Sequence, residues 1–237
     1  MPPLALLAGG LATRLRAVTT TLAKSMVQVA GEPFISHQLK LLHRNGIEDV
    51  VICVGHLGEQ IRSFVGDGAQ FGCRVRYSAD GARPLGTGGA LRQAAPLLGS
   101  CFFVMYGDSY LDIPFRPVYE AFRGAGRPAL MTVFRNHGQW DASNVEFVDG
   151  VIRRYDKVSR TADMHHIDYG LGVLSADLLT ARPADTAFDL ADLYRELVDR
   201  GELAGFEVTQ RFYEVGSPAG LAETDAHLRA LLGPSRT

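Results

Sequence analysis

Three short apolar runs, residues 4–7, 50–54 and 101–106, constrain the fold of this chain most strongly, because each is uninterrupted and soon followed by glycine. Such runs are typical of strands buried on both faces of a parallel sheet. Another strand pattern occurs at residues 74–78, and helical patterns occur at residues 33–45, 58–65 and 88–98. Alternating strands and helices predict an α/β fold, a three-layer α/β/α sandwich with a mixed, mostly parallel sheet.

The second half of the chain is less regular. Strand patterns occur at residues 129–134, 145–148, 151–155 and 205–208, and helical patterns occur at residues 117–122, 190–198 and 218–232. Asp149-Gly150 separates two of these strand patterns, and this dipeptide is a strong β-hairpin signal. We therefore expect an antiparallel extension of the same sheet, within a single domain over residues 1–237.

Composition excludes several function classes. The chain carries 24 Lys and Arg against 26 Asp and Glu, so it lacks the basic excess that favours nucleic-acid binding. No apolar segment approaches the ~20 residues of a membrane-spanning helix, and the N-terminal apolar run lacks the basic flank of a signal peptide. Cys53, Cys73 and Cys101 lie far apart in apolar or strand-like runs, which predicts reduced, buried thiols. We expect a cytoplasmic protein.

A candidate phosphate site directly follows the first strand pattern. It opens with Leu7, Ala8, Gly9 and Gly10. Consecutive glycines let main-chain amides approach a ligand, while the Thr13 hydroxyl and the planar Arg14 guanidinium suit phosphate oxygens. The segment lacks the Lys-Ser/Thr pair of a P-loop and the spacing of a dinucleotide fingerprint. It predicts a phosphate cradle, with a plain strand-to-loop turn as the alternative.

Lys24 follows in the segment Ala23-Lys24-Ser25-Met26. Together with the first loop, this segment resembles the nucleoside-diphosphate-sugar pyrophosphorylases, nucleotidyltransferases that join a sugar 1-phosphate to a nucleoside triphosphate. Their pattern is L-A-G-G-x-G-T-R-L followed by P-K-x-M. Ala12 and Ala23 replace the usual glycine and proline, and we expect the loss of proline to loosen the loop before Lys24. The resemblance implies a Rossmann-like nucleotidyltransferase fold of the GT-A-like type.

The resemblance also implies a nucleotide and metal site. A second glycine-rich loop, residues 86–89, matches the family segment that holds base and ribose. The implied nucleotide-binding residues are Leu7, Ala8, Gly9, Gly10, Thr13, Arg14, Pro84, Gly86, Thr87 and Gly88. Asp108 matches the family's metal-binding aspartate, for which a turn or N-cap residue is the alternative. Glu214 lies where a second acidic ligand, more often Asp, is expected. Mg²⁺ is the implied cofactor, since it prefers carboxylate and phosphate oxygens.

By the same resemblance, the sugar phosphate contacts a second group of residues. They are Asp108, Ser109, Asn144, Lys157, Tyr169 and Gly170. Lys157 matches the lysine of an E-K pair, with Asp156 in place of the glutamate, and is expected to hold the acceptor phosphate. The alternative for Lys157 is a solvated surface charge. His165-His166 lacks a third ligand at metal-like spacing, which favours the polar surface or the substrate rim. Trp140 is expected to pack beneath its loop, with stacking on a ligand as the alternative.

The implied reaction transfers a nucleotidyl group from a nucleoside triphosphate to a sugar 1-phosphate, giving a nucleotide sugar and pyrophosphate. Arg14, Lys24 and Asp108 are the implied catalytic residues. Residues 1–110 form mainly the nucleotide-binding half, and residues 111–237 form mainly the sugar-phosphate-binding half. The expected partners are these two substrates, without nucleic acid or membrane, and a homo-oligomer is compatible with the sequence.

Several phrases resemble the short guanylyltransferases that act on D-glycero-α-D-manno-heptose 1-phosphate, among them Pro-Leu-Gly-Thr-Gly-Gly-Ala-Leu and Tyr-Gly-Asp-Ser-Tyr-Leu. They favour GTP and this heptose phosphate as substrates. The alternatives are a uridylyltransferase, a mannose-1-phosphate guanylyltransferase and a non-catalytic nucleotide-sugar sensor. A nicotinamide-dependent dehydrogenase is disfavoured by the failed dinucleotide fingerprint.

Overall fold

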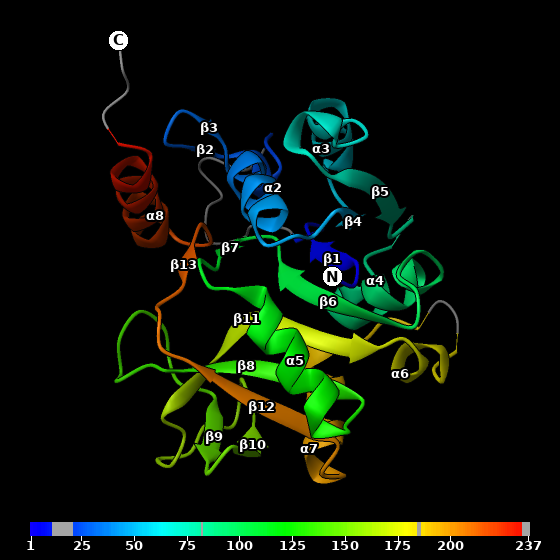
Figure 1. Ribbon diagram of the computed structural model, residues 1–237, viewed down its shortest axis with the longest axis vertical. Helices are drawn as coiled ribbons and strands as arrows, with labels where there is room; N and C mark the ends of the chain where they lie inside the picture. The colour runs from blue at the N-terminus through cyan, green and yellow to red at the C-terminus, as the bar shows by residue number, and fades with distance from the viewer. Residues whose placement is uncertain (11–20, 82, 184–185, 234–237) are drawn as a thin grey trace.

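A nine-stranded mixed sheet forms the centre of the computed structural model, which describes residues 1–10, 21–81, 83–183 and 186–233 (Figure 1). Its strands are β1 (Leu4–Leu7), β4 (Asp49–Val54), β5 (Arg74–Ala79), β6 (Cys101–Tyr106), β8 (Ala129–Arg135), β9 (Val145–Val148), β10 (Val151–Tyr155), β11 (His166–Ser175) and β12 (Leu203–Val208). They follow the order β10-β9-β11-β6-β1-β4-β5, and β8 pairs with both β11 and β12. The expected mixed, mostly parallel sheet is therefore confirmed.

The uninterrupted apolar runs form the buried parallel part of this sheet. β1 pairs in parallel with β4 and β6, and Ala5 lies between Val51 and Val104. Side chains on both faces of β1 are buried, which explains why its sequence shows no polar alternation. The carboxyl ends of β1, β4, β5 and β6 consequently meet at one edge of the sheet, where ligands bind in open α/β folds.

Helices cover both faces of the sheet. They are α2 (Phe34–Arg44), α3 (Gly58–Val65), α4 (Gly86–Ala94), α5 (Phe115–Ala125), α6 (Asp177–Thr180) and α7 (Leu190–Asp199), whereas α8 (Pro218–Leu232) lies to one side of the sheet. Leu39 of α2 and Val118 of α5 belong to the core on one face, with α3 beside them. Leu91 of α4 and Leu193 of α7 belong to the core on the other face. This confirms the predicted three-layer sandwich.

Two small sheets place α8 beside the main sheet. β2 (Gln28–Val29) pairs with β3 (Glu32–Pro33), and β7 (Ser109–Tyr110) pairs with β13 (Tyr213–Glu214). Leu228 of α8 packs in a separate apolar cluster with Phe34 and Tyr110. The β7–β13 pairing sets Ser109 opposite Glu214, so segments that are far apart in the sequence meet next to Asp108.

The predicted antiparallel extension is present, but it contains a strand that the sequence analysis does not predict. Asp149 and Gly150 have φ of 51° and 78°, as a two-residue hairpin of type I′ requires. The missed strand, β11, lies antiparallel between β6 and β8. Its register shifts between Asp168 and Gly172, and Gly170 has φ of 97°. A carboxylate and glycines interrupt its apolar pattern, which hides the strand from periodicity.

Cys53, Cys73 and Cys101 are free thiols, as expected, although Cys101 is only half-buried. Burial raises the pKa of the Cys53 thiol to about 12 and that of the Cys73 thiol to about 11, so both stay protonated at neutral pH. Among the described helices, none is long and apolar enough to cross a membrane.

Candidate active site

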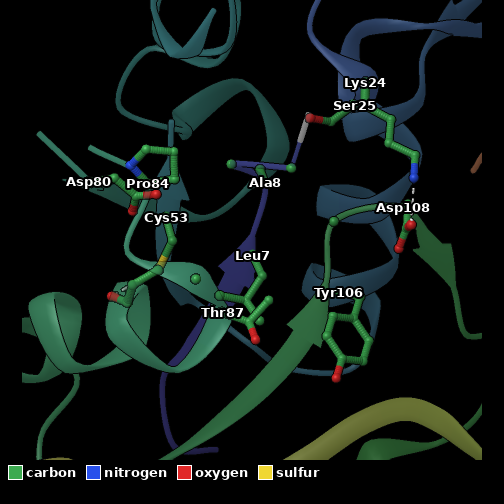
Figure 2. A pocket seen from close by; sticks show the side chains of 15 residues that line it. Leu7, Ala8, Lys24, Ser25, Cys53, Asp80, Pro84, Thr87, Tyr106 and Asp108 are labelled. Carbon is green, nitrogen blue, oxygen red and sulfur yellow. Dashed lines mark hydrogen bonds and ion pairs between the residues drawn. The ribbon is translucent and has the colours of Figure 1, made fainter. Parts of the chain in front are cut away.

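A first cavity of about 330 Å³ opens at the carboxyl ends of β1 and β6 and at the start of α4 (Figure 2). The described residues that line it are Leu7, Ala8, Gly9, Gly10, Lys24, Ser25, Cys53, Asp80, Pro84, Gly86, Thr87, Ala90, Tyr106, Gly107 and Asp108. Gly107 N donates to Leu7 O over 3.0 Å. A Cβ at Gly107 would lie 2.6 Å from Leu7 O, so only glycine lets these two strand ends approach so closely.

Most residues of the predicted nucleotide site line this cavity, but Gly88 does not. Thr13 and Arg14 lie outside the described residues. Gly88 N donates to Phe188 O over 3.0 Å, and a Cβ on Gly88 would lie 2.2 Å from the Phe188 ring. The glycine at position 88 therefore lets α4 pack closely against the segment before α7.

Thr87 ties the same two segments together. Its hydroxyl donates to the Asp189 carboxylate and accepts from Leu190 N over 2.8 Å. The Thr87 side chain thus faces the cavity while its hydroxyl is engaged at the start of α7. The position of the second glycine-rich loop depends on these contacts.

Asp80 places a carboxylate in the first cavity just beyond β5. Its main-chain N–H donates to Val54 O over 3.1 Å, which fixes its position beside the end of β4. Burial raises the pKa of the Asp80 carboxyl, and a hydrogen bond from the Leu85 amide opposes this shift. The site therefore holds a shielded hydrogen-bond acceptor near Pro84.

Lys24 and Asp108 form an ion pair, with 2.7 Å between Lys24 Nζ and Asp108 Oδ2 (Figure 2). Their side chains are 15% and 32% exposed, so the pair is partly shielded from solvent. Ala23, which replaces the family's usual proline before Lys24, makes a hydrogen bond that holds this loop in place. Ala23 N donates to Gln60 Oε1 over 2.8 Å, a bond that proline cannot make.

Glu214 lies beside this ion pair. Its Oε1 accepts from Ser217 Oγ over 2.6 Å, and its Oε2 accepts from Gly216 N. A Cβ on Gly216 would lie 2.5 Å from Glu214 Oε2, 2.9 Å from Lys24 Nζ and 3.4 Å from Asp108 Oδ2. The two carboxylates and the ammonium thus converge around one glycine. Within the described residues, no cluster of three or more His, Cys, Asp or Glu has the arrangement of a metal site.

A second cavity of about 460 Å³ adjoins the first, and Tyr106 and Asp108 line both. All six residues predicted to contact the sugar phosphate line the second cavity: Asp108, Ser109, Asn144, Lys157, Tyr169 and Gly170. They come from β7, β11 and three loops, so the fold brings together residues that the sequence separates widely. Glu214 also faces this cavity.

Two of the six residues shape the cavity wall. Asn144 Oδ1 accepts from Asp168 N over 2.9 Å, which joins its loop to β11. Tyr169 is 2% exposed and packs against Phe134 and Phe212, so most of its ring supports the wall from the core side.

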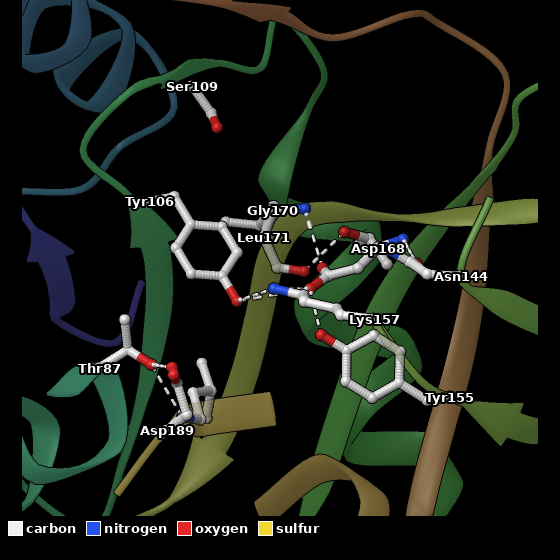
Figure 3. Close-up of polar contacts among 12 residues, drawn as sticks. Thr87, Tyr106, Ser109, Asn144, Tyr155, Lys157, Asp168, Gly170, Leu171 and Asp189 are labelled. Atoms are coloured by element: carbon white, nitrogen blue, oxygen red, sulfur yellow. Dashed lines mark hydrogen bonds and ion pairs between the residues drawn. The ribbon is translucent and has the colours of Figure 1, made fainter. Parts of the chain in front are cut away.

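The sequence analysis misses three residues that surround Lys157. They are Tyr106, Tyr155 and Asp168, which contact one another or Lys157 through their polar atoms (Figure 3). Tyr106 has a weak sequence signal, because it directly precedes Gly107-Asp108. Asp168 precedes the predicted Tyr169-Gly170 pair, but without β11 nothing in the pattern shows which way it faces.

The remaining predictions concern two aromatic positions. Trp140 packs on Phe134 with 5.7 Å between ring centroids, and the Arg211 guanidinium lies 4.4 Å from its ring. Trp140 is nevertheless 43% exposed and lines the second cavity, so it is not buried beneath its loop, and stacking on a ligand stays a prediction. His165 is exposed, in line with the polar surface, whereas His166 is buried. His166 Nε2 lies 3.1 Å from Glu207 Oε1, so the buried imidazole has a carboxylate partner.

Residues 5–156 match the family model described as Nucleotidyl transferase, and the chain belongs to this family. It is 27% identical over 214 residues to the UTP–glucose-1-phosphate uridylyltransferase of Synechocystis sp., covering 83% of this chain and 55% of that protein. It is 26% identical over 220 residues to the mannose-1-phosphate guanyltransferase of Aspergillus fumigatus, covering 90% of this chain and 60% of that protein. The chain thus spans somewhat more than half the length of these relatives.

Solved structures share the fold. A putative glucose-1-phosphate thymidylyltransferase from Bacillus anthracis matches with a TM-score of 0.83 at 22% identity, covering 96% of this chain and 95% of that one. HddC from Yersinia pseudotuberculosis, complexed with GMP-PN, matches with a TM-score of 0.80 at 21% identity, covering 96% of this chain and all of that one. These likenesses confirm the Rossmann-like nucleotidyltransferase fold.

Proposed function

We propose that this chain is a sugar-1-phosphate nucleotidyltransferase that forms a nucleotide sugar and pyrophosphate. The observation that carries the proposal is the position of the Lys24–Asp108 pair at the junction of the two cavities. The described residues that line the first cavity fall between positions 7 and 108, and those that line the second fall between positions 106 and 223, which supports a nucleotide half and an acceptor half. Two substrates bound side by side would bring their phosphates together at this junction.

In this mechanism, an oxygen of the sugar 1-phosphate attacks the α-phosphorus in line and expels pyrophosphate. Lys24 contacts the α-phosphate and Lys157 holds the acceptor phosphate, while Arg14 and the glycine amides of residues 9–10 hold the triphosphate. Holding two anions in attack geometry can lower the barrier by about 7–11 kcal/mol, and pre-aimed cations lower it further. No general base is needed, because the attacking phosphate is already ionised.

Asp108 and Glu214 fit a Mg²⁺ site that a substrate phosphate completes. Both present carboxylate oxygens around Gly216, and hard oxygen ligands suit this ion. Bound Mg²⁺ would neutralise negative charge on the α-phosphate. Lys24 pairs with Asp108 and would also be close enough to reach that phosphate.

GTP and D-glycero-α-D-manno-heptose 1-phosphate are the proposed substrates. Guanine presents adjacent N1–H and N2–H donors, and the shielded Asp80 carboxylate can accept from both. Uracil and thymine present one N–H between two carbonyl groups, so they offer Asp80 a single donor. The similarity of the fold to HddC, which was crystallised with GMP-PN, also supports this choice.

The test is a panel of the four nucleoside triphosphates against several sugar 1-phosphates, with pyrophosphate release as the readout. We expect release that depends on both substrates and is fastest with GTP and the heptose phosphate. Faster release with UTP, or with mannose 1-phosphate, would identify the uridylyltransferase or mannose-1-phosphate guanylyltransferase alternative. A chain that binds nucleotide sugars without releasing pyrophosphate from any pair would instead be a sensor.

A further inference from the structure

Asp168 is a buried acid in the wall of the acceptor cavity. Its side chain is only 4% exposed. It lies in β11, on the face of the sheet that α4 and α7 cover. Its neighbours Ile167 and Tyr169 point to the core on the opposite face. A carboxylate in such a position is costly unless hydrogen bonds or an ion pair compensate for its desolvation.

Both oxygens of this carboxylate have partners (Figure 3). Asp168 Oδ1 accepts from Gly170 N over 3.1 Å. Asp168 Oδ2 accepts from Tyr155 Oη over 3.1 Å and from Tyr106 Oη over 3.4 Å. The ammonium of Lys157 lies 3.7 Å from the same Oδ2 and donates to Tyr106 Oη over 3.4 Å. The carboxylate therefore keeps three hydrogen bonds if Lys157 turns toward a ligand.

The two tyrosines act as donors to Asp168 and as a surface for Lys157. Removal from water, with the charge of Asp168 nearby, raises the pKa of both hydroxyls well above the ordinary value, so they remain protonated. Lys157 Nζ lies 5.1 Å from the centroid of the Tyr106 ring and 5.9 Å from that of Tyr155. The Lys157 ammonium is thus held by one full charge, one hydroxyl and two aromatic rings, while its side chain is still 43% exposed.

We propose that Asp168 is a positioning residue, which together with Tyr106 and Tyr155 holds the Lys157 ammonium at the mouth of the acceptor cavity before the sugar phosphate binds. The inference rests on the proposed function, in which Lys157 contacts the acceptor phosphate. A lysine side chain has several rotatable bonds, so fixing it in advance reduces the entropy lost when the acceptor binds. Asp168 itself does not contact the phosphate, because like charges would repel.

The kinetic test is a double-mutant cycle between Asp168→Asn and Lys157→Ala. We expect Asp168→Asn to lower kcat/KM for the sugar 1-phosphate about tenfold, since small misplacement of a phosphate ligand is costly, and to leave KM for the nucleotide within about twofold. In the Lys157→Ala background, Asp168→Asn should cause no further loss. Equal losses in both backgrounds, or a parallel rise in nucleotide KM, would overturn the proposal.

Two further variants support this cycle. Tyr155→Phe removes one hydrogen bond and keeps the ring, so it should produce a smaller loss of the same kind even if Asp168→Asn folds poorly. If neither Asp168→Asn nor Tyr155→Phe changes the kinetics with the sugar 1-phosphate, the proposal is contradicted. Asp149→Asn makes the same carboxylate-to-amide change in the exposed hairpin turn and should leave all constants unchanged.

A second measurement does not depend on turnover. The chain has three lysines, Lys24, Lys40 and Lys157, so reductive ¹³C-methylation yields few NMR signals, which single lysine variants assign. We expect Asp168→Asn to shift the Lys157 signal and leave that of exposed Lys40 in place. An unshifted Lys157 signal overturns the pairing. If the wild-type chain releases no pyrophosphate with any substrate pair, but Asp168→Asn still shifts the Lys157 signal, only the proposed function is refuted.

Discussion

The two cavities meet at Tyr106 and Asp108, yet they are built in different ways. Glycines, alanines and other apolar residues line most of the first cavity, and its described charged residues are Lys24, Asp80 and Asp108. The second cavity carries eight described charged residues: Asp108, Asp141, Lys157, Arg160, Asp168, Arg211, Glu214 and Glu223. Small and apolar residues thus predominate in the first cavity, whereas charged side chains are frequent in the second.

This difference follows from what each cavity is proposed to bind. Every nucleoside triphosphate has the same phosphates and a flat base, which main-chain amides and small apolar residues can bind. Sugar phosphates differ in the positions of their hydroxyl groups, and side chains with directional hydrogen bonds distinguish these. We therefore expect the first cavity to tolerate few changes in shape and the second to determine acceptor choice.

The largest effect on turnover is expected at the junction of the two cavities, where Asp108 lines both. Lys24→Ala and Asp108→Ala should each lower kcat at least about 100-fold, because each removes an electrostatic partner of the transition state. Pyrophosphate release measures this loss. Lys40→Ala, which removes an exposed lysine paired with Glu32, is the control and should retain the wild-type rate. Near-normal turnover in Lys24→Ala would refute its assigned role.

Gly88→Ala tests the claim that backbone packing shapes the first cavity. The new Cβ would lie 2.2 Å from the Phe188 ring, and overpacking of this kind costs about 1–3 kcal/mol of unfolding free energy. We expect a lower denaturation midpoint and weaker GTP binding, because α4 must move. Gly124→Ala in α5 is the control: a Cβ there meets no atom within 4 Å, so it should stabilise the helix by up to about 1 kcal/mol. Equal effects of the two changes would contradict this account.

The same contrast explains how much of the fold the sequence predicts. Runs such as residues 50–54 form buried parallel strands because burial on both faces leaves an uninterrupted apolar pattern. Asp149-Gly150 predicts its hairpin because its conformation is local. β11 escapes prediction because Asp168 and Gly170 break its pattern, and only pairing with β6 and β8 makes it a strand.

The candidate site divides similarly. The residues of the first cavity lie in short glycine-rich motifs next to strand ends, so a resemblance in sequence identifies most of them. Contacts in the second cavity join distant positions, such as Lys157 with Tyr106, which are 51 residues apart. No local pattern connects these residues, and the proposed role of Asp168 emerges only when the fold brings Tyr106 of β6 and Tyr155 of β10 to Asp168 of β11.

Asp80→Asn tests whether a side chain gives the first cavity its base preference. The Asp80 carboxylate can accept hydrogen bonds from both N1–H and N2–H of guanine. An asparagine amide has only one oxygen that can accept, and its NH₂ group would face a second donor, so one hydrogen bond is lost. We expect the ratio of kcat/KM for GTP to that for UTP to fall about tenfold, close to 1.4 kcal/mol. Glu59→Gln changes an exposed acid of α3 and should leave the ratio unchanged. An unchanged ratio in Asp80→Asn would remove Asp80 from base selection.

The smallest effect is expected behind the second cavity, where His227 of α8 stacks on Tyr213 with 3.7 Å between ring centroids. Arg211, which lines the cavity, lies over the Tyr213 ring of this stack, 4.4 Å from its centroid. Desolvation lowers the pKa of the His227 imidazole below its usual 6.5; the charge of Asp112 opposes this shift, and the charge of Arg211 adds to it. The folded chain therefore keeps this ring neutral at a pH where the unfolded chain already binds a proton.

Below about pH 6.5, proton uptake by the unfolded chain lowers the unfolding free energy, and the loss ends once the pH is below the folded pKa of His227. His227→Phe keeps an aromatic stack but does not titrate, so it should lose less stability between pH 7 and about pH 5 than the wild type, by roughly 0.5 kcal/mol after solvent screening. Denaturant midpoints of the wild type and of His227→Phe across this pH range measure the difference. The other histidines are present in both proteins, so their titration cancels in the comparison. If the two proteins lose stability in parallel as the pH falls, protonation of His227 does not affect the aromatic stack behind the second cavity. The charged residues that line the second cavity would then be the main source of any difference in pH dependence between the two cavities.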